Sequence, residues 1–161
     1  MTRKDYNRCV ELWADDVYNF AMHCHHNESD CQDAVQEAFA ALWKNLDNVQ
    51  MAKGKSFLLS VTYRQLMMTM RSQKTAEHAL DKLPRQDTEY HPCENIDLKE
   101  ALQQAMQQLP ETQKAILQLR DIDGYSYKEI TKILNISEQQ VQVYLFRARV
   151  AMRKQLNKND F

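Results

Sequence analysis

Two N-terminal capping boxes, eleven residues apart, constrain the C-terminal part of this chain most strongly. Ser126 is followed by Glu129, and Ser137 is followed by Gln140. In each pair the serine hydroxyl can accept a hydrogen bond from an amide of the first helical turn, while the Glu or Gln side chain accepts one from the serine's own amide. Two helix starts this close leave room for two turns and a bend. The stretch Ser126–Arg149 is therefore predicted to form a helix-turn-helix.

The second helix of this motif has an apolar face and a mixed outer face. At 100° per residue, Val141, Leu145, Ala148 and Met152 share one side, which is enough to bury it. The opposite side carries Gln139, Gln142, Val143, Phe146 and Arg147. Gln and Arg can contact base edges or phosphates, and an outward Val or Phe can touch a thymine methyl group. The simpler alternative is a core helix with a solvated back.

The composition favours an all-α fold. The 161 residues include only two glycines and three prolines, and helix-forming residues dominate. We predict two small helical domains, residues 1–72 and 98–161, joined by a linker over 73–97 that is acidic and contains two of the prolines. The second is predicted to hold four helices, including the helix-turn-helix.

The first domain is predicted to begin with two amphipathic helices. The first covers residues 4–25, as one helix or as a pair of helices, and the next begins at Ser29 or Asp30 and runs through Asn45. The second has an outward polar stripe that includes Asp33, Gln36 and Glu37. Such a stripe is usually solvated, but it can also dock a basic partner.

A third helix is predicted to start with Ser56 as its cap, after a connector over 46–55. It is apolar nearly all round, so both of its sides should be covered. Arg64 and Arg71 lie on one line of it, beside the aromatic residues Phe57 and Tyr63. Such a set is typical of a surface that binds a phosphate backbone with unstacked bases. The alternative is arginines that extend from a packed helix into solvent.

Charge and cysteine usage constrain the compartment and the partners. The net charge is −1, yet Gln139–Asn159 holds five basic residues and no acidic one. This basic stretch indicates local phosphate contact, or else a solvated helix end favoured by the helix dipole. The four cysteines, without a signal peptide or an apolar run of membrane length, predict free thiols in a reducing cytoplasm and no membrane insertion.

A cluster of metal-binding residue types lies between the first two helices. It consists of His23, Cys24, His25 and His26, with Cys31 nearby. Four consecutive positions cannot all face one ion, so a helix end or loop is the favoured interpretation. A metal site formed by His23, Cys24, His26 and Cys31 stays open.

Two motifs resemble a known family. LPETQKAILQLRDIDGYSYKEITKILNISEQQVQVYLFRARVAMRKQL, residues 109–156, is similar to region 4 of bacterial RNA polymerase sigma factors of the extracytoplasmic-function group, a branch of the sigma-70 family. SDCQDAVQEAFAALWKNL, residues 29–46, resembles region 2.2 of the same family. The two motifs occur in the family's order, and the resemblance covers nearly the whole chain.

The resemblance implies a role for each surface. It implies that Asp33, Gln36 and Glu37 bind the β′ clamp helices of core RNA polymerase. It also implies that the protein contacts the β flap of the polymerase. It implies that the −10 element is opened and bound by Lys53, Lys55, Tyr63, Arg64 and Arg71. The helix-turn-helix would bind the −35 element in the major groove, through Lys128, Gln139, Gln140, Gln142, Val143, Phe146 and Arg147. The family also implies an anti-sigma factor as antagonist and a nucleoid-associated location when active.

The chain departs from the family pattern in two places. The segment that begins at Phe57 lacks the tryptophan and the asparagine usual in regions 2.3 and 2.4. In the recognition helix, Gln142-Val143-Tyr144 stands where the family often has a basic run. Fewer phosphate contacts, and so a shallower salt dependence, are expected for this domain.

The functional hypothesis is a promoter-recognition subunit without catalytic activity or cofactor. No Ser/His/Asp grouping, P-loop or carboxylate pair in the sequence indicates an enzyme. The main alternative is a stand-alone helix-turn-helix regulator that binds palindromic DNA as a dimer. A second alternative is a metal-responsive regulator that uses the His/Cys cluster.

Overall fold

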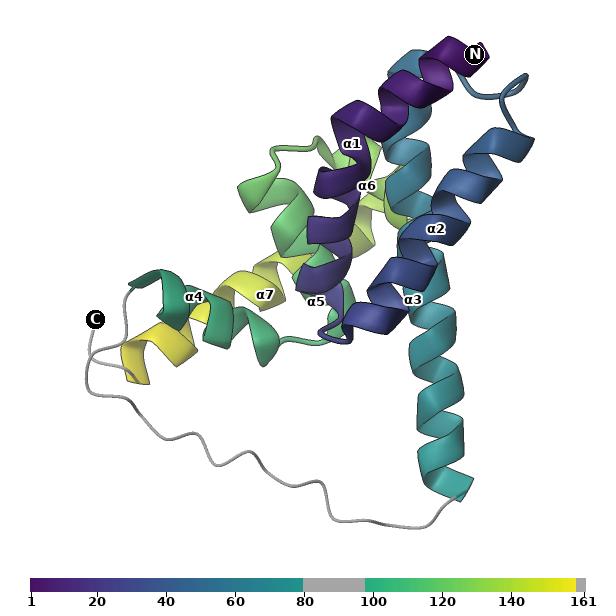
Figure 1. The fold of residues 1–161 in the computed structure, drawn as a ribbon. Helices are drawn as coiled ribbons and strands as arrows, with labels where there is room; N and C mark the ends of the chain where they lie inside the picture. Colours follow the sequence, from purple (N-terminus) through teal and green to yellow (C-terminus); the bar gives the residue numbers. More distant parts are fainter. Residues whose placement is uncertain (80–97, 159–161) are drawn as a thin grey trace.

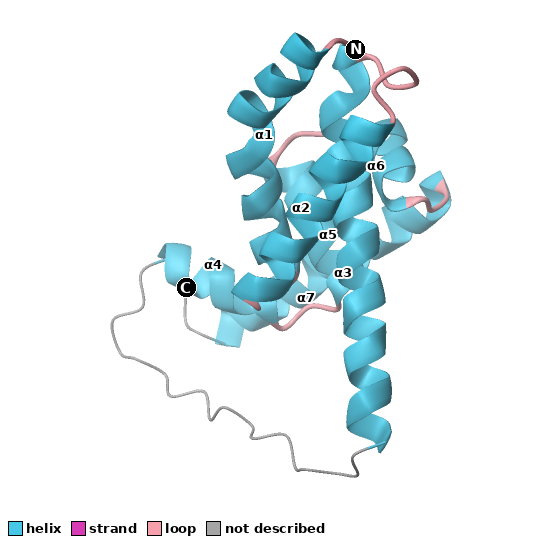
Figure 2. Ribbon diagram, turned by 45° about the vertical axis from the view of Figure 1, so that its right-hand side comes forward, coloured by secondary structure: helices cyan, strands magenta, loops and turns pink. Residues whose placement is uncertain are grey.

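The computed structural model describes residues 1–79 and 98–158, and all regular secondary structure in them is helical, which confirms the all-α prediction (Figure 2). The α-helices are α1 (Arg3–Cys24), α2 (Glu28–Lys44), α3 (Gly54–Ala79), α4 (Leu98–Gln107), α5 (Glu111–Leu117), α6 (Tyr127–Leu134) and α7 (Glu138–Lys158). A 3-10 turn, η1 (Met51–Lys53), precedes α3, and a π-helical turn, η2 (Gln118–Ile122), follows α5.

The first three helices pack against one another, with α3 in the centre (Figure 1). Val17 and Phe20 of α1, Leu42 of α2 and Leu58 and Leu66 of α3 are at most 2% exposed. Val17 and Phe20 are three residues apart, and Leu58 and Leu66 are eight apart, as expected for side chains on the inward side of a helix. Helix α1 is a single helix of 22 residues.

The predicted starts of two of these helices were wrong. Helix α2 begins at Glu28, because the side chain of Asn27, rather than that of Ser29 or Asp30, accepts a hydrogen bond from the first turn. Helix α3 begins at Gly54 and continues directly from η1, so Ser56 lies inside the helix and caps nothing. Gly54 itself is αR, so the helical backbone runs on from η1 without a separate cap, and a Cβ at this position would lie only 2.8 Å from Cζ3 of Trp13 in α1.

Gly54→Ala is expected to destabilise the fold by about 1–3 kcal/mol, although alanine favours helices over glycine. The added methyl group would overlap the Trp13 ring, which is held against the core. Urea unfolding followed by circular dichroism measures the change. The control is Ser72→Ala, an exposed site in the same helix, which should change the free energy of unfolding by less than about 0.5 kcal/mol. A Gly54→Ala protein as stable as the parent would contradict this packing.

Helix α3 extends beyond the helices that cover its first half (Figure 1, Figure 2). It continues to Ala79, so residues 73–79 are helical where we predicted a linker. Gln73 donates a hydrogen bond to Asp30 of α2 at 2.9 Å, which ties the extension to the domain. Met68 is 54% exposed, so one side of α3 is less covered than its apolar composition predicted. The rest of the predicted linker, residues 80–97, lies outside the described residues.

The second half of the chain forms the predicted four α-helices, and the helix-turn-helix is confirmed. Gly124, with φ +77°, makes the break that leads into it. Ser126 and Glu129 form a complete capping box at the start of α6. Asn135 adopts the left-handed conformation, φ 55°, at its end. Ser137 and Gln140 exchange the second pair of capping hydrogen bonds, at 3.0 and 3.1 Å.

The two domains pack directly on each other. Helix α6 lies against α3, and α5 lies against α1. Their buried residues belong to one continuous hydrophobic cluster. One polar contact across this seam joins the hydroxyl of Tyr63 in α3 to the hydroxyl of Thr112 in α5 at 3.1 Å. The sequence predicted two domains, and the structure adds that they are closed against each other.

Candidate nucleic-acid interface

The recognition helix α7 presents the predicted surface to solvent. Its inner face is buried as expected, with Val141, Leu145 and Ala148 at most 2% exposed. All five residues of the predicted outer face, Gln139, Gln142, Val143, Phe146 and Arg147, are exposed. Phe146 is 68% exposed, an unusual position for a phenylalanine.

The outer face of α7 carries a shallow depression. Gln139, Val143 and Arg147 share a shallow depression with Ser137 and Tyr144. Gln140 differs from its neighbours, because its side-chain oxygen accepts the amide of Ser137 at 3.0 Å. Its amide group remains the only part that can donate to DNA. Lys128 of α6, one of the residues that the resemblance assigns to the −35 element, is exposed.

The polar stripe of α2 is also free to bind a partner. Asp33, Gln36 and Glu37 are all exposed. Asp30, which lies on the same line, is instead tied to its own domain by hydrogen bonds from His25 and Gln73, both at 2.9 Å. These two bonds hold the pKa of Asp30 below its usual value. The stripe that remains for docking therefore begins at Asp33.

The five residues predicted for single-stranded DNA are in different environments. Lys53, Arg64 and Arg71 are exposed. Tyr63 is only 9% exposed, beneath α5. The ammonium group of Lys55 contacts Asp16 of α1 at 3.3 Å and lies 5.9 Å from the ring centroid of Tyr125. Thus three of the five residues are available, and two are engaged at the seam between the domains.

Comparison with known proteins decides the family. The model for sigma-70 region 2 matches residues 9–76, and the model for sigma-70 region 4 matches residues 99–152. The chain belongs to the sigma-70 family. The first match covers most of the N-terminal helices, including α2. The second covers most of the C-terminal helices, including the whole helix-turn-helix.

Relatives with sigma-factor names cover most of the chain. It is 26% identical to ECF RNA polymerase sigma factor SigM of Bacillus subtilis over 92% of this chain and 93% of that protein. It is 29% identical to the ECF RNA polymerase sigma-E factor of Escherichia coli over 76% of this chain and 72% of that one. These relatives belong to the extracytoplasmic-function group, and this chain is a member of that group.

A solved structure shares the fold. The sigma factor RpoE of Bartonella quintana, solved in complex with the anti-sigma factor NepR, superposes with a TM-score of 0.78 and 20% sequence identity. The superposition covers 96% of this chain and 98% of that one. The match therefore extends over both helical domains.

The His/Cys cluster of this sigma factor lies at a helix end, which is the interpretation that the sequence favoured over a metal site. His23 and Cys24 occupy the last turn of α1, and His25 follows as its C-cap. His25 binds Asp30, while the Cys31 thiol donates to the carbonyl of His25 at 3.0 Å. Within residues 1–79 and 98–158, no three His, Cys, Asp or Glu side chains converge in a way that could hold a metal ion.

The thiols of Cys9, Cys24 and Cys31 are expected to resist labelling in the native protein. All three are at most 1% exposed. Burial raises the pKa of each thiol, that of Cys31 to about 11. At pH 8 only about one molecule in a thousand would carry a Cys31 thiolate, the reactive form. Cys93 lies outside the described residues, so a Cys93→Ser variant isolates these three.

Reaction of that variant with a chromogenic disulfide reagent at pH 8 measures the thiols. In buffer, fewer than one thiol per protein molecule should react within minutes. In denaturant, all three thiols should react. Rapid labelling of all three in buffer would show that the packing around α1 and α2 is not as described.

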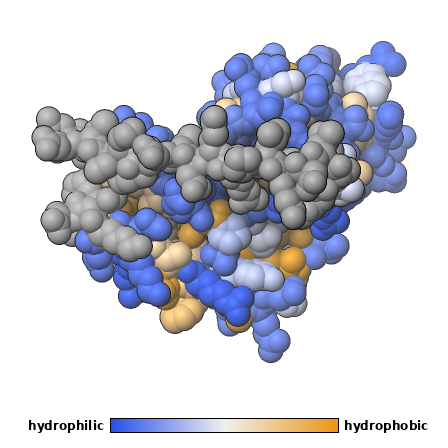
Figure 3. All heavy atoms as spheres, turned by 90° about the horizontal axis from the view of Figure 1, so that it is seen from below, coloured by the Kyte–Doolittle hydropathy of each residue, from blue (hydrophilic) through white to orange (hydrophobic). Residues whose placement is uncertain are grey.

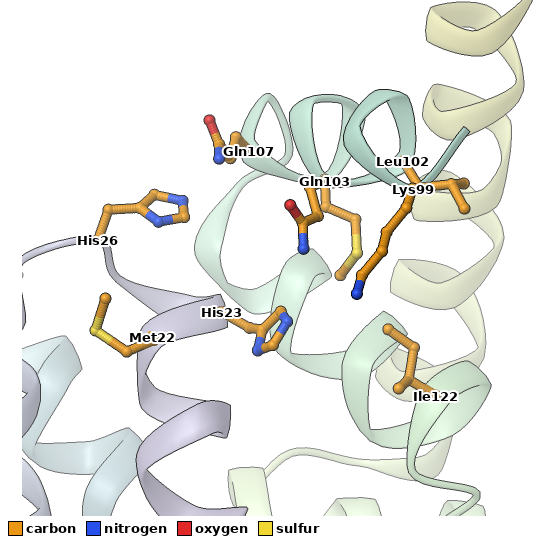
Figure 4. Close-up of a pocket in the computed structure, with 9 residues that line it drawn as sticks. Met22, His23, His26, Lys99, Leu102, Gln103, Gln107 and Ile122 are labelled. Atoms are coloured by element: carbon orange, nitrogen blue, oxygen red, sulfur yellow. The ribbon is translucent and has the colours of Figure 1, made fainter. Parts of the chain in front are cut away.

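A hollow of about 480 Å³ lies between the end of α1, α4 and η2 (Figure 4). Met22, Leu102 and Ile122 form its apolar wall, while His23, His26 and Lys99 reach towards it from the rim. Elsewhere, apolar side chains reach the surface in separate patches on a largely polar face (Figure 3). Sequence periodicity does not identify this hollow, because residues from both domains form it. None of the helices in the described residues is long and apolar enough to span a bilayer.

Proposed function

We propose that this protein is a sigma factor that binds core RNA polymerase and directs it to promoters by recognising the −35 and −10 elements and aiding promoter melting. The observation that carries the proposal is the outer face of α7. A recognition helix that leaves Gln142, Phe146 and Arg147 exposed has the side chains to contact base edges in a major groove.

The α2 stripe supports polymerase as the partner. Asp33 and Glu37 are exposed carboxylates that lie one turn apart, with Gln36 beside them. An exposed acidic stripe attracts and orients a basic partner surface. A stand-alone repressor has no need of such a face. We assign Asp33, Gln36 and Glu37 to the β′ clamp helices, by the match to region 2.2 of the family.

Melting would be driven by residues of α3 and the turn before it. Arg64, Arg71 and Lys53 are exposed and cationic, as a single-stranded backbone requires. Capture of an unstacked base offsets a cost of a few kcal/mol for each flipped base. The promoter-bound protein would work in the cytoplasm, at the nucleoid. It would not be an enzyme itself, because polymerase performs the chemistry. An anti-sigma factor, such as the one bound to the RpoE relative, is the expected antagonist.

Footprinting separates this function from that of a dimeric repressor. With core polymerase and the chain together, cleavage should be blocked over both promoter elements. With the chain alone, little DNA should be protected, because polymerase supplies most of the affinity. Strong protection of a palindrome by the chain alone would favour the repressor instead.

Gln142→Ala is expected to weaken −35 recognition by about tenfold or more, since a bidentate side chain–base pair contributes about 1–3 kcal/mol of discrimination. The effect should appear as a loss of specificity at one base position. The measurement is binding of holoenzyme to a set of single-base promoter variants. Gln108→Ala, the same substitution at an exposed position in the other part of the domain, is the control and should change nothing. Equal loss on every DNA sequence would indicate a backbone contact instead.

A further inference from the structure

The hollow between α1, α4 and η2 has the size and the apolar wall of a small-molecule site. Its volume of about 480 Å³ lies within the usual range for ligand pockets, about 300–1,000 Å³. The wall is formed by Met22, Leu102, Met106 and Ile122. Leu102 is 38% exposed and Ile122 is 58% exposed, so both leave apolar surface in contact with water. A ligand with an apolar body is stabilised here because it removes this surface, and its own, from water.

Three polar side chains point towards the middle of the hollow (Figure 4). They are His23 of α1 and Lys99 and Gln103 of α4. The Nδ1 atom of His23 bonds the carbonyl oxygen of Asn19 at 2.6 Å. Since a carbonyl oxygen only accepts, Nδ1 carries a proton, and Nε2 is the atom left for a ligand. The ammonium group of Lys99, the amide of Gln103 and a protonated Nε2 can therefore donate to one acceptor group.

The charges around the hollow favour an anion as that acceptor. No Asp or Glu is among the described residues that line it. Asp123 lines the neighbouring polar pocket of about 250 Å³ instead. At the rim, the surrounding protein atoms, then Lys114 and the two adjacent histidines, lower the pKa of His26. A field that disfavours a positive charge on His26 attracts a negative charge to the same place.

We propose that this hollow binds a small organic anion with an apolar body, namely a medium-chain monocarboxylate. The two oxygens of a carboxylate accept several hydrogen bonds, so one such group satisfies all three donors while its chain lies along the apolar wall. Methionine side chains are flexible, and they adapt the wall to the chain. The residues that line the hollow are separate from those assigned to DNA and to polymerase, so the site is additional to the proposed function.

An NMR titration of the full chain with sodium octanoate tests the site. The ring-proton resonances of His23 and His26 should move and saturate together, with a dissociation constant of about 1 mM or below, which ligands of this size can reach. The resonances of His25 should move least, because its ring is turned to Asp30 at 2.9 Å, and they serve as the internal reference. The absence of a saturable shift at His23 and His26 would overturn the proposal.

Matched compounds separate anion recognition from simple apolar adsorption. Octanol has the same tail without the charge, and acetate has the charge without the tail. Each should bind at least about tenfold more weakly than octanoate, because each lacks one of the two features that the hollow recognises. If octanol binds as tightly as octanoate, the hollow is an apolar patch without anion recognition, and the proposal fails.

Two substitutions locate the ligand. Lys99→Gln removes the cationic donor of α4 and should weaken octanoate binding about tenfold or more. Its control is Lys74→Gln, which neutralises an exposed lysine of α3 and should leave the affinity within about twofold. Ile122→Glu places a carboxylate in the wall and should abolish binding. Its control is Leu12→Glu on α1, where the replaced side chain is 51% exposed against 58% for Ile122.

The four variants also show whether a loss of binding is a loss of fold. All four replaced side chains are exposed, so each variant should unfold at the denaturant concentration of the parent. Under that condition, unchanged octanoate binding by Lys99→Gln and Ile122→Glu would overturn the proposal. An equal loss of binding in each variant and its control would overturn it as well.

Discussion

Reversing the charge of Asp33 and Glu37 together, to lysine, is expected to lower the affinity for core RNA polymerase by at least about 100-fold. Both carboxylates are exposed on α2 and lie one helical turn apart. Reversal replaces two attractive contacts with two repulsive ones, and juxtaposed like charges cost several kcal/mol. Since neither side chain is buried, the fold should be unaffected.

The measurement is equilibrium binding of labelled chain to core polymerase at two salt concentrations. Exposed charges are screened by salt, so the parent should lose affinity as salt rises and the variant should lose less. The control is Glu11→Lys with Asp15→Lys, which reverses two exposed carboxylates with the same spacing on α1. If both double variants bind equally well, α2 is not the docking face.

Leu145→Ala is expected to destabilise the protein by about 3–5 kcal/mol, a large part of the stability of a small domain. Leu145 is 2% exposed in the centre of α7, where it belongs to the core that joins α7 to the other helices. Truncation loses buried apolar area and leaves a cavity. Chemical denaturation followed by circular dichroism measures the loss.

The next residue of the same helix is the matched comparison. Phe146 is 68% exposed, so Phe146→Ala should leave the free energy of unfolding within about 0.5 kcal/mol of the parent. It should nevertheless weaken −35 binding, because it removes an apolar contact for a thymine methyl group. The two variants thus separate the core of α7 from its DNA surface. Equal destabilisation by both would show that Phe146 is packed in solution.

Local signals predicted the helix-turn-helix because its determinants are local. The capping pairs Ser126–Glu129 and Ser137–Gln140 are each three residues apart, and both form as expected. The faces of α7 follow from its helical period. By contrast, Ser56 was predicted as a cap from local sequence, but the turn η1 runs directly into α3 at Gly54, where Trp13 of α1 packs too closely for a side chain.

The closed seam lies beyond what periodicity can predict. The Tyr63–Thr112 contact joins residues 49 positions apart, across two domains. The resemblance implied that Tyr63 and Lys55 bind the −10 element, but the Tyr63 hydroxyl contacts Thr112 of α5, and Lys55 contacts Asp16 and lies over the ring of Tyr125. The sequence thus identified residue types suited to DNA, while their accessibility depends on how the domains pack. Gln140 shows the same limit at short range, because one side chain serves both as cap and as predicted DNA contact.

The most direct measurement is run-off transcription from a pool of random promoter sequences with purified core polymerase, in the presence and absence of the chain. We predict a discrete set of transcripts that depends on the chain, from templates that share two sequence elements at a fixed spacing. The Asp33→Lys, Glu37→Lys protein should not produce this set. The same transcripts from core polymerase with and without the chain would contradict its assignment as a promoter-directing sigma factor.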